Sequence, residues 1–360
     1  MTTLSADQCC VTHTFHNTSP PSFNVSTTGS DASNMAASVL ISDELWSKLD
    51  IFLNCFLVHV LSALGIVGNV MNILVLTRYG QKQTTNLILT SLSVTDLVCS
   101  VLQPFRRLQC LVAQFDLGLS VTYRTFSTIY LYTFVDICVA LSICHVAAIA
   151  IERFTAVFFP LHVNRIFTIP RVRWVIVFIY LYTIALLAPM FSRLSYQWFF
   201  DEKFNVWVSR LTLSKFYSQN YDTINFYSNF IVNNLFSSVS LFMILICSLA
   251  ITVKLTTGES KRLTKSSTTA SKKIKEAKVA KMLLTVCLTT VVTYLPSAVI
   301  YMCLLYANIT ILSSGNLYSL LQSVICVLFQ FNAAVNFLIY VTMSSKFAAG
   351  YRRLISRKKL

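Results

Sequence analysis

The chain contains seven long apolar runs separated by shorter polar segments. Each run is long enough for the roughly 20 residues that a helix needs to cross the hydrocarbon core of a bilayer. The runs stay apolar over several helical turns and do not alternate between polar and apolar positions, so they predict helices and not barrel strands. The predicted spans are 52–78, 86–110, 125–157, 172–192, 224–255, 277–306 and 314–342.

The composition supports a membrane protein. Of the 360 residues, 55% are hydrophobic and 12% are charged, and the mean hydropathy is +0.64. A water-facing globular domain of ordinary composition carries about 25% charged residues. The pattern and the composition together predict an all-α membrane protein, a seven-helix transmembrane bundle.

The net charge of +15 is explained by topology. If the amino terminus lies outside the cell, most of the 29 Lys and Arg residues fall in the inner segments, as the positive-inside rule requires. Once these flanking charges are assigned, no basic face remains for a nucleic acid. We therefore expect a multi-pass plasma-membrane protein that does not bind nucleic acid.

The ends of the chain differ from the spans. Residues 1–51 are polar and predict a flexible extracellular tail, with glycosylation triplets at Asn17 and Asn24. Residues 52–342 form the predicted bundle. Residues 343–360 predict a cytoplasmic amphipathic helix with a short tail, which places Phe347 and Tyr351 on one face and suggests contact with membrane lipid.

Strongly polar side chains at membrane depth are costly, by roughly 2.5–3.5 kcal/mol each on insertion scales, and are therefore candidates for function. Those that stand out are Asn69, Asp96, Asp136, His145, Glu152, Arg153, Asn332 and Asn336. Pro296 in the sixth run removes a backbone hydrogen bond and predicts a kink there.

Several short motifs occur in order along the seven runs. They are Gly68-Asn69, Asn86 with Leu92 and Asp96, Glu152-Arg153-Phe154 followed by Pro160, Trp174, Pro296, and Asn336 to Tyr340. In these motifs the chain resembles the rhodopsin-like (class A) family of G-protein-coupled receptors. The stretches "ERFTAVFFPLHVNRIFTIPR" and "KKIKEAKVAKMLL" look most similar to invertebrate neuropeptide and chemosensory receptors.

The resemblance implies a cell-surface receptor that senses an extracellular ligand and activates a heterotrimeric G protein when the sixth helix moves. Glu152 would hold Arg153 in the resting state and release it toward the G protein and Tyr340 on activation. The expected activation and coupling residues are Glu152, Arg153, Phe154, Tyr294, Pro296, Asn336 and Tyr340.

The resemblance also implies a water-filled pocket within the bundle that can hold an allosteric sodium ion beside Asp96. The expected lining is Asn69, Asp96, Ser142, Asn332 and Asn336. For the asparagines, simple hydrogen bonding between helices is the alternative. No other cofactor is expected.

The chain departs from the family at the outer surface. Thr128 stands where the family places its third-helix cysteine, and residues 190–222 contain no cysteine, so the outer loop is expected to be held by packing or to be mobile. The candidate partners for Cys110 are Cys9 and Cys10.

A ligand pocket is expected near the outer end of the bundle. Its predicted lining is Gln103, Tyr132, Asp136 and Tyr294, which suits a peptide or a small polar cue. For Asp136, pairing with a neighbouring helix is the alternative.

Two other classes of function are alternatives to a receptor. The acids Asp96 and Asp136, with His145, could serve an ion-coupled transporter or channel, although no internal repeat or broken helix supports this. An enzyme is disfavoured because the sequence shows no catalytic set, metal-ligand cluster or phosphate-binding loop.

Overall fold

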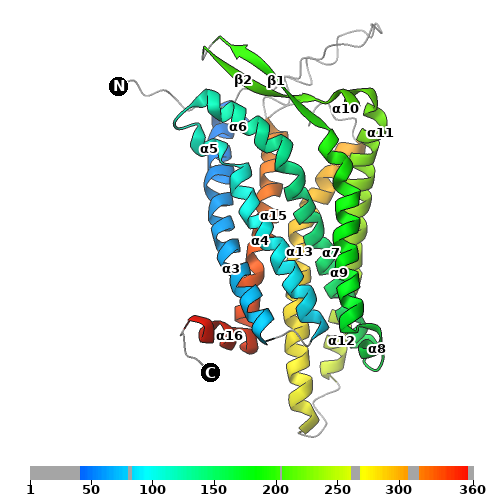
Figure 1. Cartoon of the computed structure of the whole chain (residues 1–360). Coiled ribbons are helices and arrows are strands. Elements are labelled where there is room, and N and C mark those ends of the chain that lie inside the picture. Colours follow the sequence, from blue (N-terminus) through cyan, green and yellow to red (C-terminus); the bar gives the residue numbers. More distant parts are fainter. Residues whose placement is uncertain (1–40, 80–82, 203–204, 261–267, 307–315, 356–360) are drawn as a thin grey trace.

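The computed structural model describes residues 41–79, 83–202, 205–260, 268–306 and 316–355. Its helices form a bundle whose long axes run roughly parallel (Figure 1). Seven helical segments in this part of the chain are long and apolar enough to cross a membrane, which confirms the predicted bundle. The glycosylation triplets at Asn17 and Asn24 lie outside the described residues.

The spans are built from the following elements. The first is α2 (Asp43–Asp50), a π-helical segment (Ile51–Leu57) and α3 (Val58–Tyr79). The second is α4 (Thr84–Arg106), extended by the short α5 (Gln109–Val112), and the third is α7 (Tyr132–Phe158). The fourth is α9 (Ile169–Leu187) with a 3₁₀ turn (Ala188–Ser192). The fifth is α11 (Tyr221–Phe226), a π-helical segment (Tyr227–Phe236) and α12 (Ser237–Ser260). The sixth and seventh are α13 (Thr268–Tyr306) and α15 (Asn316–Met343).

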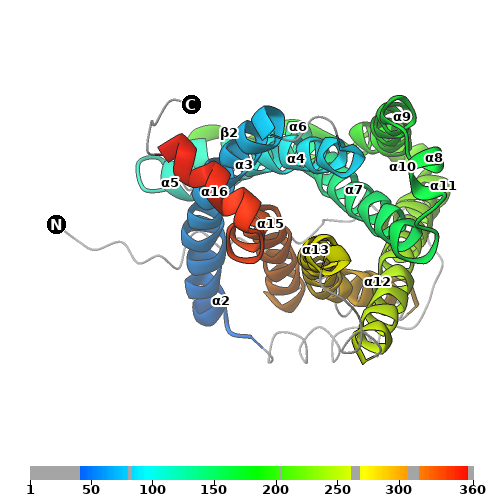
Figure 2. The ribbon, with the colours of Figure 1, turned by 90° about the horizontal axis from the view of Figure 1, so that it is seen from below.

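The two ends of the bundle are distinct. One end, which we call the hairpin end, carries α6 (Leu117–Tyr130), the strands β1 (Leu194–Asp201) and β2 (Val206–Leu213), and α10 (Lys215–Gln219). The opposite end, the α16 end, carries α8 (Val163–Ile166) and α16 (Ser345–Ile355). Figure 2 looks at the α16 end and shows α16 running beneath α15 toward α3.

The prediction of a flexible tail over residues 1–51 is wrong for its last residues, because a helix begins at Asp43. The Ser42 hydroxyl accepts a hydrogen bond from the backbone N–H of Leu45, and Asp43 and Glu44 occupy the first turn. A capping hydroxyl followed by acids in the first turn is a strong helix start. The polar sequence of this helix does not stand out as an apolar run.

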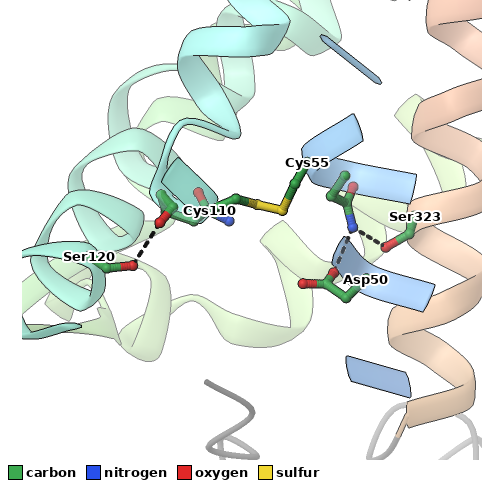
Figure 3. The surroundings of a disulfide bond; sticks show 7 residues. Asp50, Cys55, Cys110, Ser120 and Ser323 are labelled. Atoms are coloured by element: carbon green, nitrogen blue, oxygen red, sulfur yellow. Dashed lines mark hydrogen bonds between the residues drawn. A yellow bond between two sulfur atoms is a disulfide. The ribbon is translucent and has the colours of Figure 1, made fainter. Parts of the chain in front are cut away.

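The predicted partner of Cys110 is also wrong. Cys110 forms a disulfide with Cys55, which joins the first span to α5 (Figure 3). Nearby, Asn54 donates hydrogen bonds to Asp50 and to Ser323 of α15. Cys55 lies in an apolar run, where a thiol reads as a small hydrophobic group, so its sequence context gave no sign of a disulfide.

The loop after the fourth span is an antiparallel hairpin that the sequence pattern did not predict. The sequence left open whether this loop is held by packing or is mobile. In the structure, the loop packs against α6. Thr125 of α6 donates a hydrogen bond to the backbone carbonyl of Ser209 at 2.8 Å, and the N–H of Ser209 donates to Thr122 at 3.2 Å. These bonds cover the free edge of β2, which would otherwise present unpaired backbone groups.

Helix α16 packs against the bundle through its apolar face. Phe347 is 8% exposed and Tyr351 is 3% exposed. The Tyr351 hydroxyl donates a hydrogen bond to Asn72 of α3, and burial raises its pKa above the usual value. The rings of Phe347 and Tyr340 lie 5.2 Å apart. The amphipathic helix is therefore present, but these two residues of its apolar face contact protein rather than lipid.

Candidate functional site

Glu152 and Arg153 lie in the last two turns of α7, at the α16 end. The Glu152 side chain is 1% exposed and that of Arg153 is 20% exposed. The Arg153 Nη2 atom lies 3.2 Å from Glu152 Oε1, so the two side chains form an ion pair.

Two threonines at the start of α4 complete this cluster. Thr84 and Thr85 donate hydrogen bonds to Glu152 Oε1 at 2.7 and 2.9 Å. Arg153 in turn donates to the hydroxyl of Thr85 at 2.6 Å. Thr85 therefore connects the acid to the base. We call Thr84, Thr85, Glu152 and Arg153 together the arginine clamp.

The clamp holds a charged pair that is nearly removed from solvent. Breaking a buried pair by removing one partner leaves the other charge uncompensated, which is strongly unfavourable. Glu152 Oε2 and Arg153 Nε have no hydrogen-bond partner in the described part of the chain. The clamp is thus incomplete, and Arg153 retains a donor that another group can use.

Of the other expected coupling residues, Phe154 and Tyr340 make no hydrogen bond to the clamp in the described structure. Phe154 stacks on Phe158 with ring centroids 4.5 Å apart. Tyr340 is fully buried, and its hydroxyl has no hydrogen-bond partner among the residues that the structure describes. No hydrogen bond joins Tyr340 to Arg153 in this structure, so their expected contact stays a prediction for another conformation.

Asp96 of α4 lies in the middle of the bundle and is 1% exposed. Ser142 of α7 donates a hydrogen bond to Asp96 Oδ1 at 3.0 Å, and Asn336 of α15 donates to Oδ2 at 2.9 Å. Three of the five residues of the expected pocket, Asp96, Ser142 and Asn336, are therefore brought together from three different helices. No basic side chain within the described ranges lies within 4.0 Å of the carboxylate.

The other two expected members of this pocket bond elsewhere. Asn69 donates to the backbone carbonyl of Ala333 at 2.8 Å, which ties α3 to α15. Asn332 accepts hydrogen bonds from Thr290 and Thr293 of α13 at 3.1 and 3.3 Å. The Asn332 Nδ2 group is buried without a partner in the described structure, so it is available to a water or another acceptor.

A second polar cluster lies toward the hairpin end. Gln103 of α4 is 2% exposed, accepts a hydrogen bond from Arg106 Nε at 3.0 Å and donates to the thiol of Cys326. The Arg106 guanidinium lies over the ring of Tyr132, 5.2 Å from its centroid. Arg106 also interacts electrostatically with Asp136, so the expected pocket residues Gln103, Tyr132 and Asp136 share this region. The sequence pattern did not identify Cys326.

The family of the chain follows from comparison with known proteins. Residues 68–340 match the family model described as 7 transmembrane receptor (rhodopsin family), and this match covers more than half of the chain. The chain belongs to the rhodopsin family. This confirms the resemblance at the level of the family, makes the chain a multi-pass membrane protein, and does not favour the transporter or channel alternative.

Individual relatives match a smaller part of the chain. The growth hormone secretagogue receptor type 1 of Sus scrofa is 30% identical over 135 residues, and that of Oryctolagus cuniculus is 29% identical over 137 residues. Each alignment covers 36% of this chain and 35% of the relative. The chain therefore matches about a third of the length of these curated relatives. The finer likeness to invertebrate receptors stays a prediction.

Within this rhodopsin-family chain, Tyr294 and Pro296 lie in α13. Tyr294 is 4% exposed, donates a hydrogen bond to the backbone carbonyl of Val139 in α7 at 3.0 Å, and lies 4.6 Å from the ring of Phe329. Tyr294 thus links the sixth span to the third, two residues before Pro296. A change at this contact would act on both helices.

His145 does not join the two acids in a relay. Its Nδ1 atom lies 2.7 Å from the backbone carbonyl of Leu141, and its Nε2 atom lies 2.8 Å from the hydroxyl of Ser91. Both ring nitrogens therefore have partners, and the ring packs edge-on against Tyr180. This arrangement gives His145 a role in helix packing.

Proposed function

We propose that this rhodopsin-family receptor lies in the plasma membrane with its amino terminus outside the cell. It binds an extracellular peptide or chemosensory ligand near the hairpin end and activates a heterotrimeric G protein at the α16 end. The observation that carries this proposal is the arginine clamp. It holds Arg153 at the end of a span, in a chain whose family couples ligand binding to signalling.

The route between the two ends runs through α7 and α13 in this proposal. Ligand contact near Asp136 and Tyr132 changes the packing of α7 against Tyr294, and Pro296 allows the α16 half of α13 to swing. The swing opens a space beside Arg153, which leaves the clamp and engages the G protein. The contact between Tyr294 and Val139 supports this route because it joins the two helices directly.

The Asp96 cluster fits a sodium ion as an allosteric ligand. A buried carboxylate without a nearby cation requires a counter-ion, a proton or water to offset its desolvation. The Asp96 and Ser142 oxygens are the hard donors that such a cation prefers. When bound, the ion would supply the missing positive charge and stabilise the resting packing of the bundle.

The proposal is tested by expressing the chain in cells and screening peptide and odorant libraries for second-messenger responses. A ligand that raises the signal in the wild type should fail in Arg153→Glu at equal surface expression. Arg124→Glu is the control, because Arg124 is exposed on α6 at the hairpin end. A response that persists in Arg153→Glu, or ion currents in membranes without any G protein, would contradict the proposal.

A further inference from the structure

The hairpin β1–β2 has one aromatic face. Side chains alternate between the two faces of a strand, so Tyr196, Trp198 and Phe200 lie on the same side of β1. Trp207 pairs with Phe200 across the hairpin and shares that side. All four side chains are exposed, Trp198 by 50% and Trp207 by 64%. We call these four residues the aromatic face.

The opposite face of the hairpin is more polar. It carries Gln197, Asp201 and Arg210, and the Arg210 guanidinium lies 3.1 Å from a carboxylate oxygen of Asp201. Arg210 also covers the ring of Phe199, 5.7 Å from its centroid. This face also exposes Phe199 and Val206, but it carries an ion pair, whereas the exposed side chains of the aromatic face are all aromatic.

Helix α6 shows which way the aromatic face is turned. The helix runs from Leu117 toward the third span. Phe126, near the span, lies 5.1 Å from the ring of Tyr196 and 6.3 Å from that of Trp198. At the far end of α6, a Cβ atom on Gly118 would lie 2.9 Å from Val206, on the opposite face. The aromatic face is thus turned toward the end of α6 that adjoins the third span.

The position of Phe126 on α6 shows how far the aromatic face lies from the third span. Phe126 precedes the first residue of the third span, Tyr132, by six positions, so at about 1.5 Å per residue it lies no more than about 9 Å beyond the span. The polar headgroup layer occupies roughly 5–8 Å on each side of the hydrocarbon core. The rings of Tyr196 and Trp198, which lie 5.1 and 6.3 Å from that of Phe126, are therefore close to the headgroup layer.

The aromatic face continues an apolar surface of the spans. Within the spans, the exposed rings of Phe134 and Phe191 pack edge to face at 5.0 Å. Tyr130, also exposed, lies next along the chain and stacks on Phe126 at 6.2 Å. Figure 2 shows β2 at the rim of the helix ring, and β2 contacts α6 there. An apolar strip thus runs from the lipid-facing surface to the hairpin.

We propose that the aromatic face of the hairpin binds the headgroup region of the outer leaflet. Trp and Tyr are suited to this layer because each ring combines an apolar body with a polar group. The hairpin then anchors the outer loop to the bilayer, in addition to its contacts with α6. The loop position becomes sensitive to the lipid around the receptor.

Tryptophan fluorescence tests this proposal on the intact receptor. The chain has only four tryptophans, Trp46, Trp174, Trp198 and Trp207. A receptor that keeps Trp198 alone, with the other three replaced by Phe, is placed in nanodiscs of phosphatidylcholine with bromine close to the headgroup. We expect its emission to be quenched at least as strongly as that of the Trp174-only receptor, because Trp174 is 74% exposed on a span.

The same samples are titrated with iodide, a quencher confined to water. We expect Trp198 to resist iodide in nanodiscs and to become accessible after transfer to detergent. Quenching of Trp198 by iodide without quenching by brominated lipid would overturn the proposal. Protection from both quenchers would also overturn it, because another protein surface would then cover the face. The same quenching is then measured on the wild type and on Trp198→Phe. The difference between their emissions reports on Trp198 in a receptor that keeps Trp46, Trp174 and Trp207.

Discussion

The substitution Glu152→Gln isolates the charge of the arginine clamp. Glutamine keeps the shape of the side chain and a carbonyl oxygen that can accept hydrogen bonds from Thr84 and Thr85. It removes the negative charge that faces Arg153 at 3.2 Å. A hydrogen bond to a charged partner contributes about 1.5–3 kcal/mol, and this contribution belongs to the resting state alone if activation releases Arg153.

Loss of that contribution shifts the equilibrium toward the active state. A free-energy change of about 1.4 kcal/mol alters an equilibrium constant by a factor of ten. The ratio of active to resting receptor should therefore rise roughly 10- to 100-fold. The assay is the ligand-independent second-messenger level in cells, normalised to surface expression. The control is Glu44→Gln, because Glu44 forms an exposed ion pair with Lys48 far from the clamp. Equal basal signals from wild type and Glu152→Gln at equal expression would refute the reasoning.

Three further predictions concern other parts of the bundle. Cys55→Ser, Cys110→Ser and the double variant should lower unfolding stability equally, by roughly 3–5 kcal/mol on the chain-entropy model, as measured by thermal unfolding; unequal losses would contradict the disulfide. Tyr351→Phe should lose about 1 kcal/mol with the hydrogen bond to Asn72. Because burial raises the pKa of Tyr351, its ionisation should destabilise the wild type more than this variant as pH rises above about 10. Asp96→Asn should abolish any difference in melting temperature between sodium and choline chloride, and a difference that persists would place the ion elsewhere.

The spans were predictable because lipid imposes a simple rule on the sequence. A helix that crosses the bilayer must remain apolar over its whole length, and each of the seven runs does so. Polar residues within such runs are then conspicuous. This is why the sequence alone singles out Glu152, Arg153 and Asp96 as candidates, whereas their functional roles stay proposals.

The remaining features depend on contacts between distant segments. Cys55 and Cys110 lie in or beside apolar runs, and only the approach of the first span to α5 pairs them. Thr84 and Thr85 start the second span as ordinary hydroxyl residues, and their bonds to Glu152 arise from the packing of α4 against α7. A local pattern cannot specify which helix faces which.

Release of guanine nucleotide from a purified heterotrimeric G protein tests the central claim most directly. The wild type, Glu152→Gln and Glu152→Gln/Arg153→Glu receptors are each reconstituted in nanodiscs with the same heterotrimer. The account predicts faster release with Glu152→Gln than with wild type, and release at the rate of empty nanodiscs with the double variant. Equal rates for all three receptors, or undiminished release from the double variant, would contradict the account.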